Sequence, residues 1–72
     1  MTKSNIKNNI RRYRFDAGEM TQQELADKVG VSRQTIVAIE KENYSPSLEL
    51  AFRIAHVFNT PLEEIFSYGK GE

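Results

Sequence analysis

The sequence contains no cysteine and only one histidine among its 72 residues. Disulfide bonds and cysteine-ligated zinc sites are therefore excluded. His56 has no second histidine and no acidic residue at a spacing typical of metal ligands, so we expect neither a metal nor a cofactor. A domain this short then depends on efficient helix packing or on a partner for its stability.

Long apolar runs are also missing. No segment approaches the length that crosses a bilayer, and the first residues lack the apolar stretch of a signal peptide. We therefore expect a cytoplasmic protein without membrane contact. Repeats, linkers and low-complexity segments are absent, which predicts a single domain over residues 1–72 with irregular ends at 1–4 and 67–72.

Neither sign of charge is in excess, because ten basic residues balance ten acidic ones. The distribution is uneven, however: most basic side chains fall in the first half of the chain and most acidic ones in the second. One N-terminal stretch carries five cations without an acid between them, namely Lys3, Lys7, Arg11, Arg12 and Arg14. Such a stretch is either a solvated helix face or a surface that contacts phosphate groups.

Start and stop signals predict three helices in the first part of the chain. Thr21 and Glu24 have the spacing of a capping box, Gly30 is a helix stop, and Ser32 is a good N-cap. Together with apolar residues at helical spacing from Ile6 to Ala17, these signals predict helices over about 6–17, Gln22–Val29 and Arg33–Lys41.

Two prolines predict the start of two further helices. Pro46 follows Ser45, a residue able to cap a helix, and Pro61 follows Thr60 with Glu63 at capping-box spacing. The apolar pattern then extends the predicted helices over about 46–58 and 61–66. The predicted fold class is all-α with five helices.

The segment from Gln22 to Lys41 is the most informative part of the chain. Its two helices are joined by a turn so short that they must cross steeply, which brings Ala26 against Ile36. Core packing explains the apolar residues of this segment. It does not explain why two adjacent helix starts are polar, with Gln22, Ser32, Arg33, Gln34 and Thr35.

This segment resembles the helix-turn-helix of phage-repressor and Cro-type regulators, the xenobiotic-response-element family. The similarity covers nearly the whole chain, through the segments Arg14–Gly18, Thr21–Ala26, Val31–Ile36, Ile39–Glu40, Tyr44–Leu48 and Pro61–Phe66. The resemblance implies a compact lambda-repressor-like fold with the helix-turn-helix at helices two and three. It also implies a transcriptional regulator that binds double-stranded DNA sequence-specifically.

Among short family members, the chain is similar to cytolysin-repressor-like proteins. That similarity implies a homodimer without a separate ligand domain, so we expect no small-molecule effector. It also allows a short strand over 67–70 that pairs with the extended N-terminus.

Helix starts offer unpaired N–H groups and partial positive charge, which suit phosphate. Gln22 and Ser32 are therefore predicted to contact the DNA backbone. Arg33 can bind guanine and Gln34 can bind adenine through paired hydrogen bonds, although either can contact phosphate instead.

Further contacts are predicted on both sides of these residues. Val37 and Ala38 lie one turn further along and either touch a thymine methyl group or pack against the protein. The segment after the helix either contacts the backbone or faces solvent, and family members commonly have a glycine there whose left-handed geometry Asn43 can adopt. The predicted DNA contacts are Arg12, Gln22, Ser32, Arg33, Gln34, Thr35, Val37, Ala38, Lys41, Asn43 and Tyr44.

The family resemblance also implies an ion pair between Arg14 and Glu40 that holds the fold together. The alternative is that Arg14 belongs to the basic N-terminal surface.

Apolar side chains are crowded near the C-terminus, where Leu62, Ile65, Phe66 and Tyr68 follow Pro61. A single-turn helix cannot bury all of them, so they either complete the core or form a homodimer interface. We expect Leu62 and Ile65 to reach the core, and Phe66 and Tyr68 to remain partly exposed and to pair across a twofold axis. Such a dimer presents two recognition helices to a palindromic operator, as a repressor does.

Catalysis is not predicted, because the sequence has no nucleophile–base set and no glycine-rich phosphate loop. The remaining alternative to a repressor is an antitoxin-type protein-binding module that binds DNA secondarily.

Overall fold

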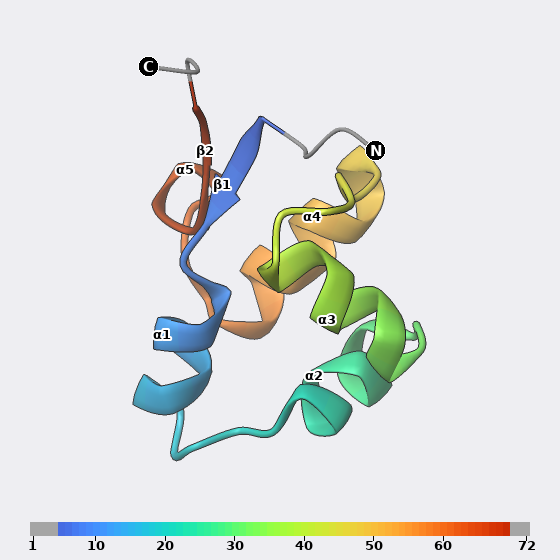
Figure 1. Cartoon of the computed structure of the whole chain (residues 1–72). Helices are drawn as coiled ribbons and strands as arrows, with labels where there is room; N and C mark the ends of the chain where they lie inside the picture. Colours follow the sequence, from blue (N-terminus) through green and yellow to red (C-terminus); the bar gives the residue numbers. More distant parts are fainter. Residues whose placement is uncertain (1–4, 70–72) are drawn as a thin grey trace.

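The computed structural model describes residues 5–69, and within that range it contains five helices and one two-stranded sheet (Figure 1). The elements are β1 (Ile6–Asn8), α1 (Ile10–Asp16), α2 (Gln22–Val29), α3 (Arg33–Glu40), α4 (Leu48–Val57), α5 (Leu62–Ile65) and β2 (Phe66–Tyr68). The predicted five-helix fold is therefore confirmed. Of the ends predicted to be irregular, residues 1–4 and 70–72, with Lys3 among them, lie outside the described residues, whereas Ser67 and Tyr68 are part of β2.

The residues predicted to start and stop α2 and α3 make the expected capping hydrogen bonds and the expected left-handed turn. Thr21 Oγ1 accepts the Glu24 N–H at 2.9 Å while the Glu24 carboxylate accepts the Thr21 N–H at 2.8 Å, which completes the capping box. Gly30 ends α2 in the left-handed region at φ 80°, and Ser32 Oγ accepts the Thr35 N–H at 3.2 Å. The boundaries of the helix-turn-helix are thus confirmed, with α3 ending one residue before the expected Lys41.

Six large side chains from five elements form the fully buried centre of the core: Ile10, Leu25, Ile36, Ile39, Ile54 and Ile65. Each contributes about 1.5–3 kcal/mol relative to an exposed position. Ala26 is also fully buried, as expected for a small residue between α2 and α3. The core therefore joins α1, α2, α3, α4 and α5 and fixes the position of the helix-turn-helix.

The first helix is shorter than predicted, because Ile6 lies in a strand and α1 begins at Ile10. β1 pairs antiparallel with β2, with Ile6 opposite Tyr68 and Asn8 opposite Phe66. The Asn8 side chain also accepts the Ile10 N–H at 3.1 Å, a local bond that replaces a further helical turn. The strand pair considered from the family resemblance is present, although its N-terminal strand occupies residues predicted to be helical.

The predicted starts of the last two helices were wrong. Ser47, rather than Ser45, caps α4 by accepting the Leu50 N–H at 3.1 Å. Thr60 does not cap α5, since the N-cap position is Pro61 and no side chain accepts a hydrogen bond there; the Thr60 hydroxyl instead donates to the Phe58 carbonyl at 2.8 Å. α5 then ends at Ile65, and Phe66 continues in the extended conformation of β2.

The end of α3 has the geometry of a Schellman motif. The Asn43 N–H donates to the Ala38 carbonyl at 3.0 Å, and the Glu42 N–H donates to the Ile39 carbonyl at 2.9 Å. The left-handed residue is Glu42, at φ 64°, so its assignment to Asn43 was wrong. This geometry fixes the register in which the chain leaves α3.

Candidate nucleic-acid interface

The N-terminal end of α3 presents the side chains predicted to recognise bases. Arg33 and Gln34 are both exposed, and neither makes a hydrogen bond or ion pair with another side chain within residues 5–69. Ser32 and the half-buried Thr35 differ from them, because the Ser32 hydroxyl caps the helix and lies 3.1 Å from Thr35 Oγ1. The two residues with the chemistry for base recognition are therefore the ones left available.

Val37 and Ala38 follow on α3 and are both half-buried. Part of each apolar surface is thus taken up by packing and part remains accessible. Contact of either side chain with a thymine methyl group stays a prediction.

An ion pair holds the other end of α3. Arg14 Nε donates to Glu40 Oε2 at 2.7 Å and Arg14 Nη2 donates to Glu40 Oε1 at 3.0 Å, which is a bidentate pair. The two side chains are only 13% and 11% exposed. Arg14 therefore belongs to the interior of the fold rather than to the basic surface, as the family resemblance implies.

Two further groups join this pair, and we refer to the whole as the Glu40 cluster. Arg14 Nη1 donates to the Met20 carbonyl at 2.8 Å, and Gln22 Nε2 donates to Glu40 Oε1 at 3.1 Å. The cluster therefore connects α1, the α1–α2 turn, α2 and α3. One N–H of the Gln22 amide is engaged here, while the amide has a second that can meet the predicted phosphate.

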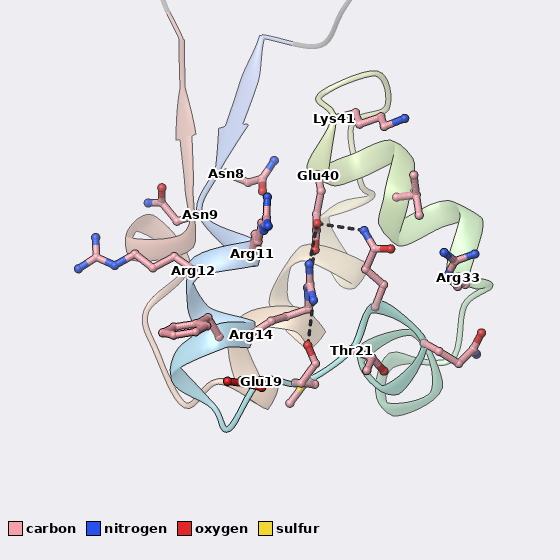
Figure 2. Close-up of a pocket in the computed structure, with 15 residues that line it drawn as sticks. Asn8, Asn9, Arg11, Arg12, Arg14, Glu19, Thr21, Arg33, Glu40 and Lys41 are labelled. Atoms are coloured by element: carbon pink, nitrogen blue, oxygen red, sulfur yellow. Dashed lines mark hydrogen bonds and ion pairs between the residues drawn. The ribbon is translucent and has the colours of Figure 1, made fainter.

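A groove of about 1200 Å³ lies between α1 and α3, with the Glu40 cluster at its centre (Figure 2). The basic residues that line it are Arg11, Arg12, Arg33 and Lys41, in addition to the paired Arg14. Figure 2 shows Arg11 in the space between the two helices and Arg12 pointing away from it. Arg11 belongs to the basic stretch that was expected either to be solvated or to contact phosphate. Its position on α1, three residues before Arg14, places it on the side that faces α3.

The segment after α3 carries both a positive and a negative side chain, Lys41 and Glu42. Lys41, Asn43 and Tyr44 are exposed, which is compatible with the predicted backbone contacts. Glu42 is less exposed and its carboxylate lies 3.4 Å from Lys7 Nζ of β1. The negative charge of Glu42, which would repel a phosphate group here, is thus partly neutralised by Lys7 of β1.

The apolar side chains expected at the dimer surface differ in their exposure. Ile65 is buried and Leu62 half-buried, as expected, but Phe66 is also buried, with 8% of its surface exposed. The prediction that Phe66 is exposed was wrong, because the start of β2 turns this side chain into the core. Tyr68 is 64% exposed and remains available.

Two asparagines were missed by the sequence analysis. Asn8 Nδ2 donates to the Ile39 carbonyl of α3 at 2.9 Å, and Asn9 Nδ2 donates to the Glu64 carbonyl of α5 at 3.2 Å. No local signal identifies them, because both partners lie more than thirty residues away in sequence.

No group of three or more acidic or histidine side chains in residues 5–69 is arranged to hold a metal ion. No helix of that range combines the length and the apolar character needed to cross a bilayer.

The chain is similar to proteins of one family. The helix-turn-helix family model matches residues 10–65. An HTH-type transcriptional regulator of Methanocaldococcus jannaschii is 52% identical over 67 residues, which cover 93% of this chain and 100% of that protein. The transcriptional repressor RstR of the cryptic phage CTXphi, from Vibrio cholerae, is 35% identical over 49 residues, which cover 68% of this chain and 44% of RstR.

A solved structure supports the fold alone. The crystal structure of a Bacteroides fragilis protein matches with a TM-score of 0.75 at 22% identity, and the match covers 86% of this chain and 98% of that chain. The family model spans most of the chain, and the first relative is more than half identical over its whole length. The chain therefore belongs to the XRE-type helix-turn-helix family of transcriptional regulators, as its sequence predicts.

Proposed function

We propose that the chain is a homodimeric repressor that binds a palindromic DNA operator through α3, in the cytoplasm and without catalysing a reaction. The observation that carries the proposal is the exposed N-terminal end of α3. Arg33 and Gln34 stand there without intramolecular partners within the described range, on a helix whose other end is fixed by the Glu40 cluster.

The chemistry of this surface suits duplex DNA. Arginine matches guanine O6 and N7, and glutamine matches adenine N6 and N7, in the major groove. The exposed cations Arg11 and Lys41 lie along the same groove and fit phosphate groups beside the contacted bases. Different residues of one surface therefore contact the bases and the phosphate groups of the DNA.

Dimerisation is proposed because one α3 can contact only one half-site. Exposed large apolar side chains remain beyond the helix-turn-helix, at Tyr44, Leu48, Phe52 and Tyr68. Since Phe66 is buried, we assign the interface to a surface that includes Tyr68. The repressor role is supported by the similarity to RstR, a transcriptional repressor of a cryptic phage.

The test is selection of bound sequences from a random double-stranded DNA pool. We expect a palindrome whose half-sites are about one helical turn, or roughly 34 Å, apart. Recovery of a single unpaired half-site would contradict the dimer. If no preferred sequence were recovered, the result would contradict sequence-specific binding to an operator and favour the antitoxin-type alternative.

Sedimentation tests the interface with Tyr68→Glu and a matched control, Ser67→Glu. Both residues are exposed on β2, so both changes add the same charge to the same strand. We expect Tyr68→Glu to sediment as a monomer and Ser67→Glu to remain a dimer. If the Tyr68→Glu protein remained a dimer, the interface would have to lie on another surface.

A further inference from the structure

Asn8 connects the strand pair to the recognition helix. It lies at the end of β1, and its side-chain amide donates to the carbonyl of Ile39, one residue before the end of α3. The bond is 2.9 Å long and half-buried, so it is only partly open to competition from water. The Glu40 cluster is thus not the only contact that fixes this end of α3.

The carbonyl that Asn8 contacts belongs to the Schellman motif. Ile39 O accepts the Glu42 N–H as well, and a carbonyl oxygen has lone pairs for two donors. Asn8 therefore completes the hydrogen bonding at the point where α3 turns into the following segment. Its loss removes one support of that carbonyl, so the Schellman bonds open more often and the end of the helix moves more freely relative to β1.

The amide of Asn8 is itself held in place. Its Oδ1 accepts the Ile10 N–H at 3.1 Å, and its backbone is paired with Phe66, whose side chain lies in the core. A second link from β1 to this segment is the ion pair of Lys7 with Glu42. Because Lys7 is largely exposed and such pairs contribute little, Asn8 is the stronger of the two links.

Small movements at this end of α3 have large effects at the other. A helix of eight residues is about 12 Å long, so a tilt of about 5° moves its far end by about 1 Å. Paired hydrogen bonds to a base edge tolerate only a few tenths of an ångström, since donor–acceptor distances span about 2.7–3.2 Å. The orientation of α3 therefore decides whether Arg33 and Gln34 meet their bases.

We propose that Asn8 is a positioning residue for sequence recognition: through the Ile39 carbonyl, the β1–β2 pair sets the orientation of α3. The proposal rests on the proposed function of α3 in reading DNA. It assigns to the strand pair a contribution to base discrimination that is separate from its contribution to stability.

The variant Asn8→Asp isolates this contact. Its carboxylate still accepts the Ile10 N–H, but it has no N–H to give to the Ile39 carbonyl. Asn9→Asp is the matched control, because Asn9 makes the equivalent bond to the Glu64 carbonyl of α5 and lies next in the chain. Each change removes one side-chain donor bond and adds one negative charge just before α1.

The first measurement is the affinity ratio between the selected operator and operators with a changed base at the positions that Arg33 and Gln34 contact. We expect the ratio to fall about tenfold in Asn8→Asp, or about 1.4 kcal/mol, and to stay unchanged in Asn9→Asp. The added charge weakens binding to all sequences alike, so it cancels in the ratio. Equal ratios in the two variants would overturn the proposal.

The second measurement needs no DNA and separates failure of the inference from failure of the proposed function. We expect the backbone amides of Glu42 and Asn43 to exchange hydrogen faster in Asn8→Asp, and at the wild-type rate in Asn9→Asp. Unchanged exchange in Asn8→Asp would overturn the inference, whatever the DNA selection yields. If either Asp variant fails to fold, Asn8→Ala and Asn9→Ala replace the pair in both measurements with the same expected contrast.

Discussion

The two ends of α3 are held very differently. At the C-terminal end, side chains from β1, α1 and α2 converge, namely Asn8, Arg14 and Gln22. At the N-terminal end, the Ser32 hydroxyl is the one side-chain group within residues 5–69 that caps the backbone, while Arg33 and Gln34 are exposed. One short helix therefore divides two tasks between its ends, since its orientation is set at one end and the side chains predicted to bind bases are left available at the other.

Breaking the fixed end should have the largest effect. Arg14→Ala leaves the carboxylate of Glu40, which is 11% exposed, without its charged partner. The pair is partly buried, and loss of a hydrogen-bonded charged partner costs about 1.5–3 kcal/mol, so we expect a clear fall in the free energy of unfolding, measured by urea titration. Arg11→Ala, an exposed position on the same helix, is the control and should change stability by less than about 0.5 kcal/mol. If Arg14→Ala and Arg11→Ala had the same free energy of unfolding, the Glu40 cluster would not stabilise the fold.

Changing the exposed end should affect recognition without affecting folding. We expect Arg33→Ala and Gln34→Ala each to cost about 1–3 kcal/mol at one base position of the half-site, because a bidentate contact is lost. The midpoint of thermal unfolding should stay at the wild-type value, since neither side chain has an intramolecular partner within residues 5–69. A uniform loss of affinity for all sequences would reassign that residue to a phosphate contact.

Ser32 takes part in both tasks, because its hydroxyl caps α3 at the helix start where phosphate is predicted to approach. Ser32→Ala removes the N-cap of α3 and should lower the free energy of unfolding by about 1 kcal/mol. Ser32→Asp restores a cap acceptor but places a negative charge where phosphate is predicted to approach. We therefore expect it to keep the stability of the wild type and to bind DNA more weakly, as measured by unfolding and by titration with operator. Wild-type affinity in Ser32→Asp would show that phosphate does not approach this helix start.

The smallest effect is expected from the surface ion pair near the fixed end. Lys7→Ala removes the partner of Glu42 and should change the free energy of unfolding by less than about 0.5 kcal/mol. It also exposes the acid of Glu42 to approaching phosphates, so affinity should fall slightly for all sequences at low salt. The fall should vanish when Lys7→Ala is made together with Glu42→Gln, and persistence of the full loss would mean that Lys7 contacts DNA itself.

The parts of the fold that the sequence predicts depend on neighbouring residues. The capping box of Thr21 and Glu24, the stop at Gly30 and the cap at Ser32 involve groups within a few positions of one another. Their outcome is decided locally, so the boundaries of α2 and α3 follow from the residues alone. The Arg14–Glu40 pair needed the family resemblance, because it joins two helices that are distant in sequence.

The parts that were not predicted depend on distant partners or on competing local bonds. Helical spacing predicts a helix at Ile6, and a strand pair between the two ends of the chain was expected only from the family resemblance, without the register that places Ile6 opposite Tyr68. Phe66 is buried only because β2 turns it toward the core. At Thr60 and Ser45, several polar groups could cap the next helix, and the sequence does not show which hydroxyl the backbone will meet.

The pairing of β1 with β2 also bears on the order of events in folding. It joins segments from opposite ends of the described chain, and each strand has only three residues. The entropy of closing so long a loop is recovered only after the helices have packed, so we expect the strands to pair last and to separate first under native conditions. Under the proposed function, a newly folded molecule then gains its full ability to discriminate operators only when β2 pairs with β1.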